Sequence, residues 1–200
     1  MKGFLVRNLE SYAVLKKMGY GEKCILDASM YTWNDQSVDF WREEGVLRNT
    51  VPLELNEGEL KHRDNTSSEL LLYGYIPLML SAQCVRKNLF GCTGKYETAY
   101  LKDRYNSEFP VKCCCTPWEC SSLEKAKYCY NIIYNSIPYG LPGERERVEK
   151  LNLQSLRLAF TVEKPEEARE IFKEFQSVYQ KNGKPSGRRY TKGHFKRGAE

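Results

Sequence analysis

The chain has 200 residues, enough for one domain with a hydrophobic core, and 41% of them are hydrophobic, which excludes an extended disordered protein. Its net charge is +5, from 31 basic and 26 acidic residues, a mild excess. No apolar run approaches the roughly 20 residues that a membrane span needs, and charge appears within the first residues. We therefore expect no membrane partner, no signal peptide and a cytoplasmic location.

The first half of the chain alternates short apolar runs with amphipathic stretches. The apolar runs predict strands at 4–7, 24–27, 51–55, 70–73 and 76–80. The amphipathic stretches predict helices at 9–18, 34–45 and 57–62. Strands separated by helices in this way indicate right-handed βαβ units and a parallel sheet. The pattern fits half of a (β/α)₈ barrel, and it fits a doubly wound sheet equally well.

The second half of the chain begins with a different pattern. Residues 98–103 and 109–112 flank a turn and predict a hairpin, and 132–134 predicts a further strand. Residues 156–162 predict a late strand, and Pro165 opens a helix with an apolar stripe. We expect one α/β domain, with a partial β/α barrel in residues 1–141 and a C-terminal strand, helix and basic tail in 142–200. Because half a barrel leaves its edge strands unpaired, we expect a longer protein or a partner that supplies the missing half-barrel.

Cysteines are the most conspicuous chemical feature of the chain. Seven of the eight fall between positions 84 and 129: Cys84, Cys92, Cys113, Cys114, Cys115, Cys120 and Cys129. Without an export signal, disulfides are not expected. Thiolates are the ligands of zinc and of iron–sulfur clusters, and the spacing lacks the two C-x₂-C pairs of a zinc ribbon. Such irregular spacing suits a [4Fe–4S] site gathered from several loops, with zinc or a set of buried, metal-free thiols as alternatives.

Other candidate catalytic residues are acids that follow predicted strands. Asp27 and Glu54 both stand where sites form in β/α barrels, and a structural hydrogen bond is the alternative for each. The two histidines, His62 and His194, are remote from any serine motif, so a Ser-His-Asp triad has little support. The sequence contains no HExxH, no G-x-S-x-G and no P-loop.

The C-terminal segment concentrates the positive charge. Seven basic residues stand between Lys181 and Arg197, with no acid until Glu200. A solvated tail is one interpretation. The other is a contact with RNA or another polyanion, because clustered Lys and Arg release counterions from phosphates.

Several segments together resemble peptidase family U32, the collagenase-like proteases. They are spread over nearly the whole chain, at 4–9, 31–34, 52–56, 73–84, 101–104, 109–111, 129–136 and 190–198. The runs from Pro77 to Cys84 and from Cys129 to Ser136 are the most specific. The resemblance implies a TIM-barrel-like catalytic domain, of which this chain would be the later half with a small cysteine-rich insertion.

The family name implies hydrolysis of a peptide substrate, but some members are similar to oxygen-independent hydroxylases of RNA or of a quinone precursor. Those members use a [4Fe–4S] cluster on four cysteines, which the resemblance places here at Cys84, Cys92, Cys115 and Cys129. The family has its last two ligands close together, whereas 116–128 separates them here, so Cys120 and Cys113 are alternates for the third. We expect an iron–sulfur enzyme that hydroxylates RNA. The alternatives are a collagenase-like protease and an inactive fragment or subunit of a larger protein.

Overall fold

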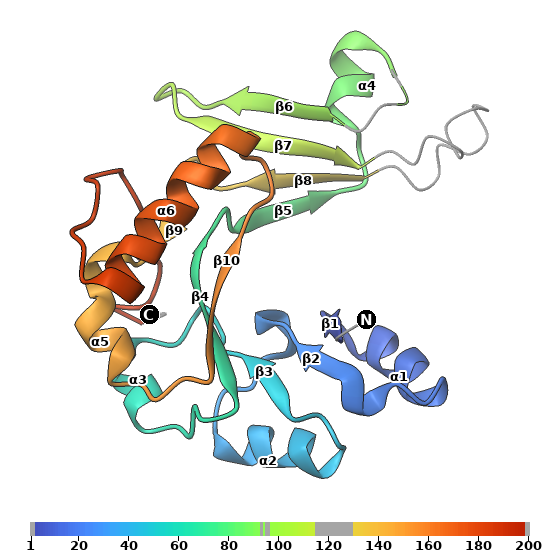
Figure 1. The fold of residues 1–200 in the computed structure, drawn as a ribbon. Helices are drawn as coiled ribbons and strands as arrows, with labels where there is room; N and C mark the ends of the chain where they lie inside the picture. Colours follow the sequence, from blue (N-terminus) through green and yellow to red (C-terminus); the bar gives the residue numbers. More distant parts are fainter. Residues whose placement is uncertain (1–2, 93, 95–96, 115–129, 199–200) are drawn as a thin grey trace. The chain divides into compact units, whose positions relative to one another are not determined.

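The structure is a computed structural model that describes residues 3–92, 94, 97–114 and 130–198 (Figure 1). It contains two compact units. The parallel-sheet unit comprises the residues up to Tyr73 with Gly140–Ala159 and the residues from Glu170 onward. The antiparallel-sheet unit comprises Gly74–Tyr139 and Phe160–Arg169. No helix in the described part of the chain is long and apolar enough to cross a membrane.

A parallel sheet forms the centre of the first unit and confirms the predicted βαβ organisation. Its first four strands pair in chain order and in parallel: β1 (Phe4–Val6), β2 (Cys24–Leu26), β3 (Arg48–Thr50) and β4 (Ser68–Gly74). Strand β10 (Ser155–Ala159) follows β4 in the sheet order, and the short β9 (Tyr139–Gly140) also pairs with β4. The fold is thus mixed α/β, with a parallel sheet compatible with half of a β/α barrel.

Asparagine caps start the three helices that connect these strands. The helices are α1 (Leu9–Lys17), α2 (Asp35–Glu43) and α3 (Glu57–Lys61). Asn8, Asn34 and Asn56 precede them, and each side-chain oxygen accepts a hydrogen bond from the backbone N–H three residues later. An asparagine in this position satisfies one of the backbone donors that a helix start leaves unpaired. The sequence predicts that the second helix begins at Asn34 or Asp35, and Asn34 is its cap.

Apolar side chains from the strands, from α1 and α2 and from the connection between α2 and β3 form a core cluster. Its buried members are Val6, Tyr12, Cys24, Leu26, Trp41 and Val46. The rings of Tyr12 and Trp41 meet edge to face, with centroids 4.9 Å apart. Burial raises the pKa of the Cys24 thiol, so Cys24 serves as a small apolar side chain in this core.

The strand predicted at 51–55 is wrong in position, because β3 ends at Thr50. Val51 still donates to the carbonyl of Glu69 at 2.9 Å, but Pro52 has no N–H to continue the ladder, and Leu53 and Glu54 form a turn. The true strand, Arg48-Asn49-Thr50, contains no apolar residue. Its buried side chains are polar, so the apolar pattern pointed to the wrong residues.

An antiparallel sheet forms the second unit. Its strand order is β5 (Pro77–Ser81), β8 (Tyr130–Tyr134), β7 (Glu108–Cys114) and β6 (Glu97–Lys102). The predicted hairpin is confirmed as β6 and β7, which pair from Glu97 with Cys113 to Lys102 with Glu108. Asp103 closes its turn by accepting hydrogen bonds from the backbone N–H groups of Tyr105 and Ser107. The short helix α4 (Val85–Phe90), which the sequence analysis did not predict, follows β5.

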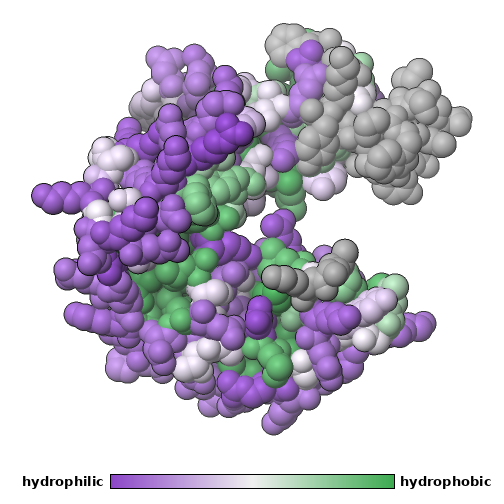
Figure 2. Space-filling view, in the orientation of Figure 1, coloured by the Kyte–Doolittle hydropathy of each residue, from purple (hydrophilic) through white to green (hydrophobic). Residues whose placement is uncertain are grey.

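Two helices complete the described chain. Helix α5 (Arg145–Glu149) follows a 3₁₀ turn at Pro142–Glu144, and α6 (Pro165–Lys181) begins at the predicted proline. Helix α6 buries Ile171, Phe175 and Val178 along one side. The side of α6 that faces the viewer in Figure 2 carries mainly hydrophilic side chains, as its amphipathic sequence predicts.

Candidate metal centre

The antiparallel sheet brings two cysteines and an asparagine together. Cys113 on β7 lies directly opposite Asn131 on β8, and Asn131 lies opposite Ser81 on β5. Cys84 stands three residues after Ser81 and caps α4, where its sulfur accepts a hydrogen bond from the backbone N–H of Lys87 at 3.5 Å. Residues paired across antiparallel strands share a face, so Cys113 and Asn131 point the same way.

The two thiols and the amide form a buried hydrogen-bonded group. The thiol of Cys113 donates to Oδ1 of Asn131 at 3.2 Å, and the side chains of Cys84 and Cys113 hydrogen-bond to each other. Asn131 is 0% exposed. Its amide nitrogen, Nδ2, is its only side-chain donor, so the hydrogen bond by which Asn131 lowers the pKa of Cys84 runs from Nδ2 to the Cys84 sulfur. The amide therefore contacts both thiols, through its oxygen to Cys113 and its nitrogen to Cys84.

The surroundings make the two thiols unequal. Burial alone would raise the pKa of Cys84, but the backbone N–H of Lys87 and the side chain of Asn131 outweigh burial and lower this pKa below its usual value. The pKa of Cys113 is raised, first by burial and then by the neighbouring Cys84. Cys84 therefore supplies a thiolate more readily than an ordinary buried cysteine, and the thiolate is the form that binds metals.

The other predicted cysteine ligands are distributed as follows. Cys92 is exposed, two residues beyond the end of α4. Cys114 is buried and follows Cys113 on β7, so it points to the opposite face of the sheet. Cys115, Cys120 and Cys129 lie outside the described residues. Within the described ranges, no group of three or more His, Cys, Asp or Glu side chains gathers to hold a metal.

The two candidate catalytic acids, Asp27 and Glu54, do not interact with each other in the described structure. Asp27 follows β2 and accepts from Arg7 Nε at 2.8 Å and from Arg157 at 2.7 Å. Burial would raise its pKa, but the bonds to Arg157 and the charge of Arg7 lower the pKa on balance, so Asp27 is a carboxylate bound by two cations. Glu54 is half-buried in the turn after β3, and in the described structure no hydrogen bond or ion pair joins it to Asp27. The arrangement of Asp27 fits the structural alternative.

A buried arginine in the parallel-sheet unit escaped the sequence analysis. Arg63 is 7% exposed, and its guanidinium makes five hydrogen bonds. The acceptors are the carbonyl and hydroxyl oxygens of Thr32, Oδ1 of Asn49, Oδ1 of Asn65 and the hydroxyl of Ser68. All are neutral, and the set joins β3, the start of β4 and the loop before α2. The sequence around Arg63, Lys-His-Arg-Asp-Asn, looks like an exposed polar turn, so no signal marked it.

The basic C-terminal segment is packed rather than free in solvent. Phe195 is only 2% exposed, and its carbonyl accepts from the backbone N–H of Glu57 at 2.8 Å. Lys192 and Lys196 both pair with the buried carboxylate of Glu144, at 2.5 and 3.1 Å. Part of the positive charge is thus neutralised within the parallel-sheet unit. The exposed Lys181, Lys184, Arg189 and Arg197 form no ion pair with another described residue.

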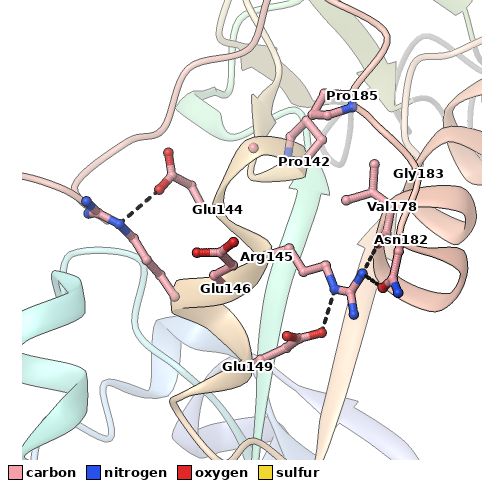
Figure 3. A pocket seen from close by; sticks show the side chains of 11 residues that line it. Pro142, Glu144, Arg145, Glu146, Glu149, Val178, Asn182, Gly183 and Pro185 are labelled. Atoms are coloured by element: carbon pink, nitrogen blue, oxygen red, sulfur yellow. Dashed lines mark hydrogen bonds and ion pairs between the residues drawn. The ribbon is translucent and has the colours of Figure 1, made fainter.

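Glu144 also borders a pocket of about 670 Å³ between α5 and the end of α6 (Figure 3). Arg145 crosses one wall, where it bonds to Glu149 at 2.5 Å, to the carbonyl of Val178 at 3.1 Å and to the side chain of Asn182. These bonds satisfy the guanidinium internally. The pocket therefore fits a role in fixing α5 to the end of α6 better than a role in binding.

Replacing Glu144 with glutamine should lower the free energy of unfolding by about 1–2 kcal/mol at neutral pH, since it breaks two charge-assisted bonds to lysines that are themselves partly solvated. Burial would raise the pKa of Glu144, but Lys192 and Lys196 lower it below its usual value. Its stabilising effect is therefore complete above the unfolded-state pKa of about 4.3 and is lost as the pH falls through the lower folded-state pKa.

Urea unfolding of the wild type and the Glu144→Gln variant across this pH range tests the expectation. The difference between the two proteins should narrow as the pH falls below about 4.3. Glu146→Gln is the matched control, because Glu146 is exposed on the adjoining helix α5 and its replacement should change stability little. A difference that persists unchanged in acid would show that Glu144 does not act through its charge.

Comparisons with protein families, with curated proteins and with solved structures found no match to this chain. The function proposed below therefore rests on the chemistry of the described residues and on the resemblance of its segments.

Proposed function

We propose that Cys84 and Cys113 are two ligands of a [4Fe–4S] cluster, with zinc as the alternative metal. The observation that carries this proposal is the buried pair of thiols bridged by the Asn131 side chain, with Cys84 also accepting from the backbone N–H of Lys87. Coordinated thiolates accept N–H hydrogen bonds in this way, so the pair has the surroundings of metal ligands. The remaining ligands would come from Cys92 and from Cys115, Cys120 or Cys129.

The residues around the pair have distinct tasks in this proposal. The backbone N–H of Lys87 helps to lower the pKa of Cys84, which favours its thiolate, and Asn131 orients Cys113 from the neighbouring strand. Arg86 on α4 pairs with Glu97 on β6 at 3.3 Å, which fixes Cys84 against the sheet. A bound [4Fe–4S] cluster would supply one-electron transfer or a Lewis-acidic iron.

For the whole protein we propose a U32-type enzyme that acts in the oxygen-independent hydroxylation of RNA in the cytoplasm. The parallel sheet supports the TIM-barrel-like half-domain that the resemblance implies, and another half-barrel would complete it. The exposed basic residues of the C-terminal segment are available to contact phosphates. Peptide hydrolysis is the weaker candidate, because Asp27, the candidate acid, is bound by two arginines.

Anaerobic incubation with RNA tests this function. We add reconstituted protein to an oxygen-free extract of cells that lack it. We expect it to add the mass of one oxygen atom to a nucleoside of the cellular RNA. Conversion of C–H to C–OH with water as the oxygen source releases two protons and two electrons, and an electron acceptor in the extract takes up the electrons. Mass spectrometry of digested RNA measures the product. Cys84→Ala should abolish it and Cys24→Ala should not, because Cys24 lies in the core of the other unit. If the wild type cleaved gelatin and left the RNA unmodified, the result would contradict the proposal and favour the peptidase.

A further inference from the structure

Two aromatic side chains in the loop after β2 are exposed and parallel. Tyr31 is 50% exposed and Trp33 44%, and their rings stack with centroids 6.0 Å apart and planes 8° apart. A large aromatic ring normally buries its faces against the core. Here both rings project from one loop and expose a substantial fraction of their surface to solvent.

The residue between them explains why both rings face outward. Thr32 is buried, and its hydroxyl donates to Oδ1 of Asn49 at 3.2 Å. Arg63 binds both oxygens of Thr32, at 3.0 and 3.1 Å. With Thr32 fixed inward, the side chains on either side of it point out. Tyr31 is held at φ 51°, a left-handed conformation that a bulky residue rarely adopts. A strained, anchored loop of this kind is typical of a pre-organised binding site.

An arginine lies on the same edge of the sheet. Arg7 follows β1, and its carbonyl accepts from the hydroxyl of Ser29, in the loop that carries the aromatic pair. Its Nε is bonded to Asp27, while its side chain remains 69% exposed. In the described structure its two terminal nitrogens have no protein acceptor. The carboxyl ends of parallel strands are where α/β sheets bind ligands, and this edge combines open aromatic faces with an available cation.

We propose that Tyr31 and Trp33 form a stacking platform for an unpaired base of single-stranded RNA, with Arg7 as a contact for the neighbouring phosphate. Every base has a π-face that stacks on aromatic side chains, and a cation at the same edge of the sheet matches the charge of the backbone. An uncharged ligand would make no use of the exposed guanidinium. This inference rests on the proposed function and specifies its substrate as an unpaired strand.

Binding of a fluorescently labelled single-stranded oligoribonucleotide to the full chain, measured by anisotropy at low salt, tests the platform. A Tyr31→Ala/Trp33→Ala variant should bind at least about tenfold more weakly. Arg7→Ala should make the RNA affinity less sensitive to salt concentration. The reduction should correspond to the loss of about one phosphate contact. Tyr105→Ala is the matched control, because Tyr105 is a 73% exposed aromatic beside Arg104 in the other unit, and its loss should leave binding unchanged.

The outcomes separate this inference from the proposed function. If the double variant bound RNA as tightly as the wild type, the platform alone would be overturned, since iron content and RNA hydroxylation are measured independently. No binding by the wild type would overturn both the platform and the RNA substrate. Binding of an unstructured peptide in place of RNA, lost in the double variant, would assign the aromatic pair to a peptide and overturn the inference.

Discussion

Replacing Arg63 with methionine is expected to lower the free energy of unfolding by about 3–5 kcal/mol. Methionine fills much of the volume but donates no hydrogen bond. The substitution would leave oxygens of Thr32, Asn49 and Asn65 buried without one of their donors. A loss of this size is a large part of the stability of a typical domain.

Urea unfolding followed by circular dichroism measures this effect. Arg42→Met is the matched control: Arg42 is 45% exposed and, in the described part of the chain, pairs with the surface acids Asp39 and Asp64, so its loss should change stability little. The Arg63 variant should also weaken RNA binding under conditions where it remains folded, because it releases Thr32. Equal stability of the two variants would show that the buried network does not hold this unit together.

Cys113→Ser is expected to lose the cluster, whereas Cys114→Ser is expected to keep it. The two residues are adjacent and both buried, but they point to opposite faces of β7, and Cys113 is the one that lies opposite Asn131 and bonds to it. Loss of one thiolate ligand should weaken metal binding strongly, because the thiolate is the form that binds the metal. Iron content after anaerobic reconstitution gives the comparison directly.

The same two variants control for folding, since each removes one buried thiol from the same strand. Matching circular dichroism spectra would show that a loss of iron comes from a lost ligand. A Cys114→Ser variant that loses iron as readily as Cys113→Ser would contradict the assignment. It would indicate that the opposite face of the sheet carries the site.

Local signals predicted much of the fold. The asparagine at position 34 marks a helix start by its own chemistry, and the alternation of apolar runs with helices predicted the parallel pairing of β1 to β4. The strand near Pro52 was misplaced because the side chains buried on β3 are polar. Their partner, Arg63, lies 14 residues beyond Asn49, and no pattern along the chain links them.

The candidate site could be predicted only in part. Clustering identified the cysteines, but choosing between Cys113 and its neighbours needs the register of β7 against β8, which sets Cys113 opposite Asn131. A shift of one residue would exchange the faces of Cys113 and Cys114. The aromatic platform depends on Thr32 being held inward by distant residues, so the sequence shows the Tyr-Thr-Trp motif without showing that both rings are exposed.

The most direct test of the metal centre is the iron and acid-labile sulfide content, with a visible spectrum, of the protein purified without oxygen. The account predicts about four irons and a comparable amount of sulfide per chain, with charge-transfer absorption that is lost in Cys84→Ala. Zinc in place of iron would keep the metal centre and remove its redox chemistry. A well-folded sample with neither iron nor zinc would contradict the account, because Cys84 and Cys113 would then be buried thiols without a metal.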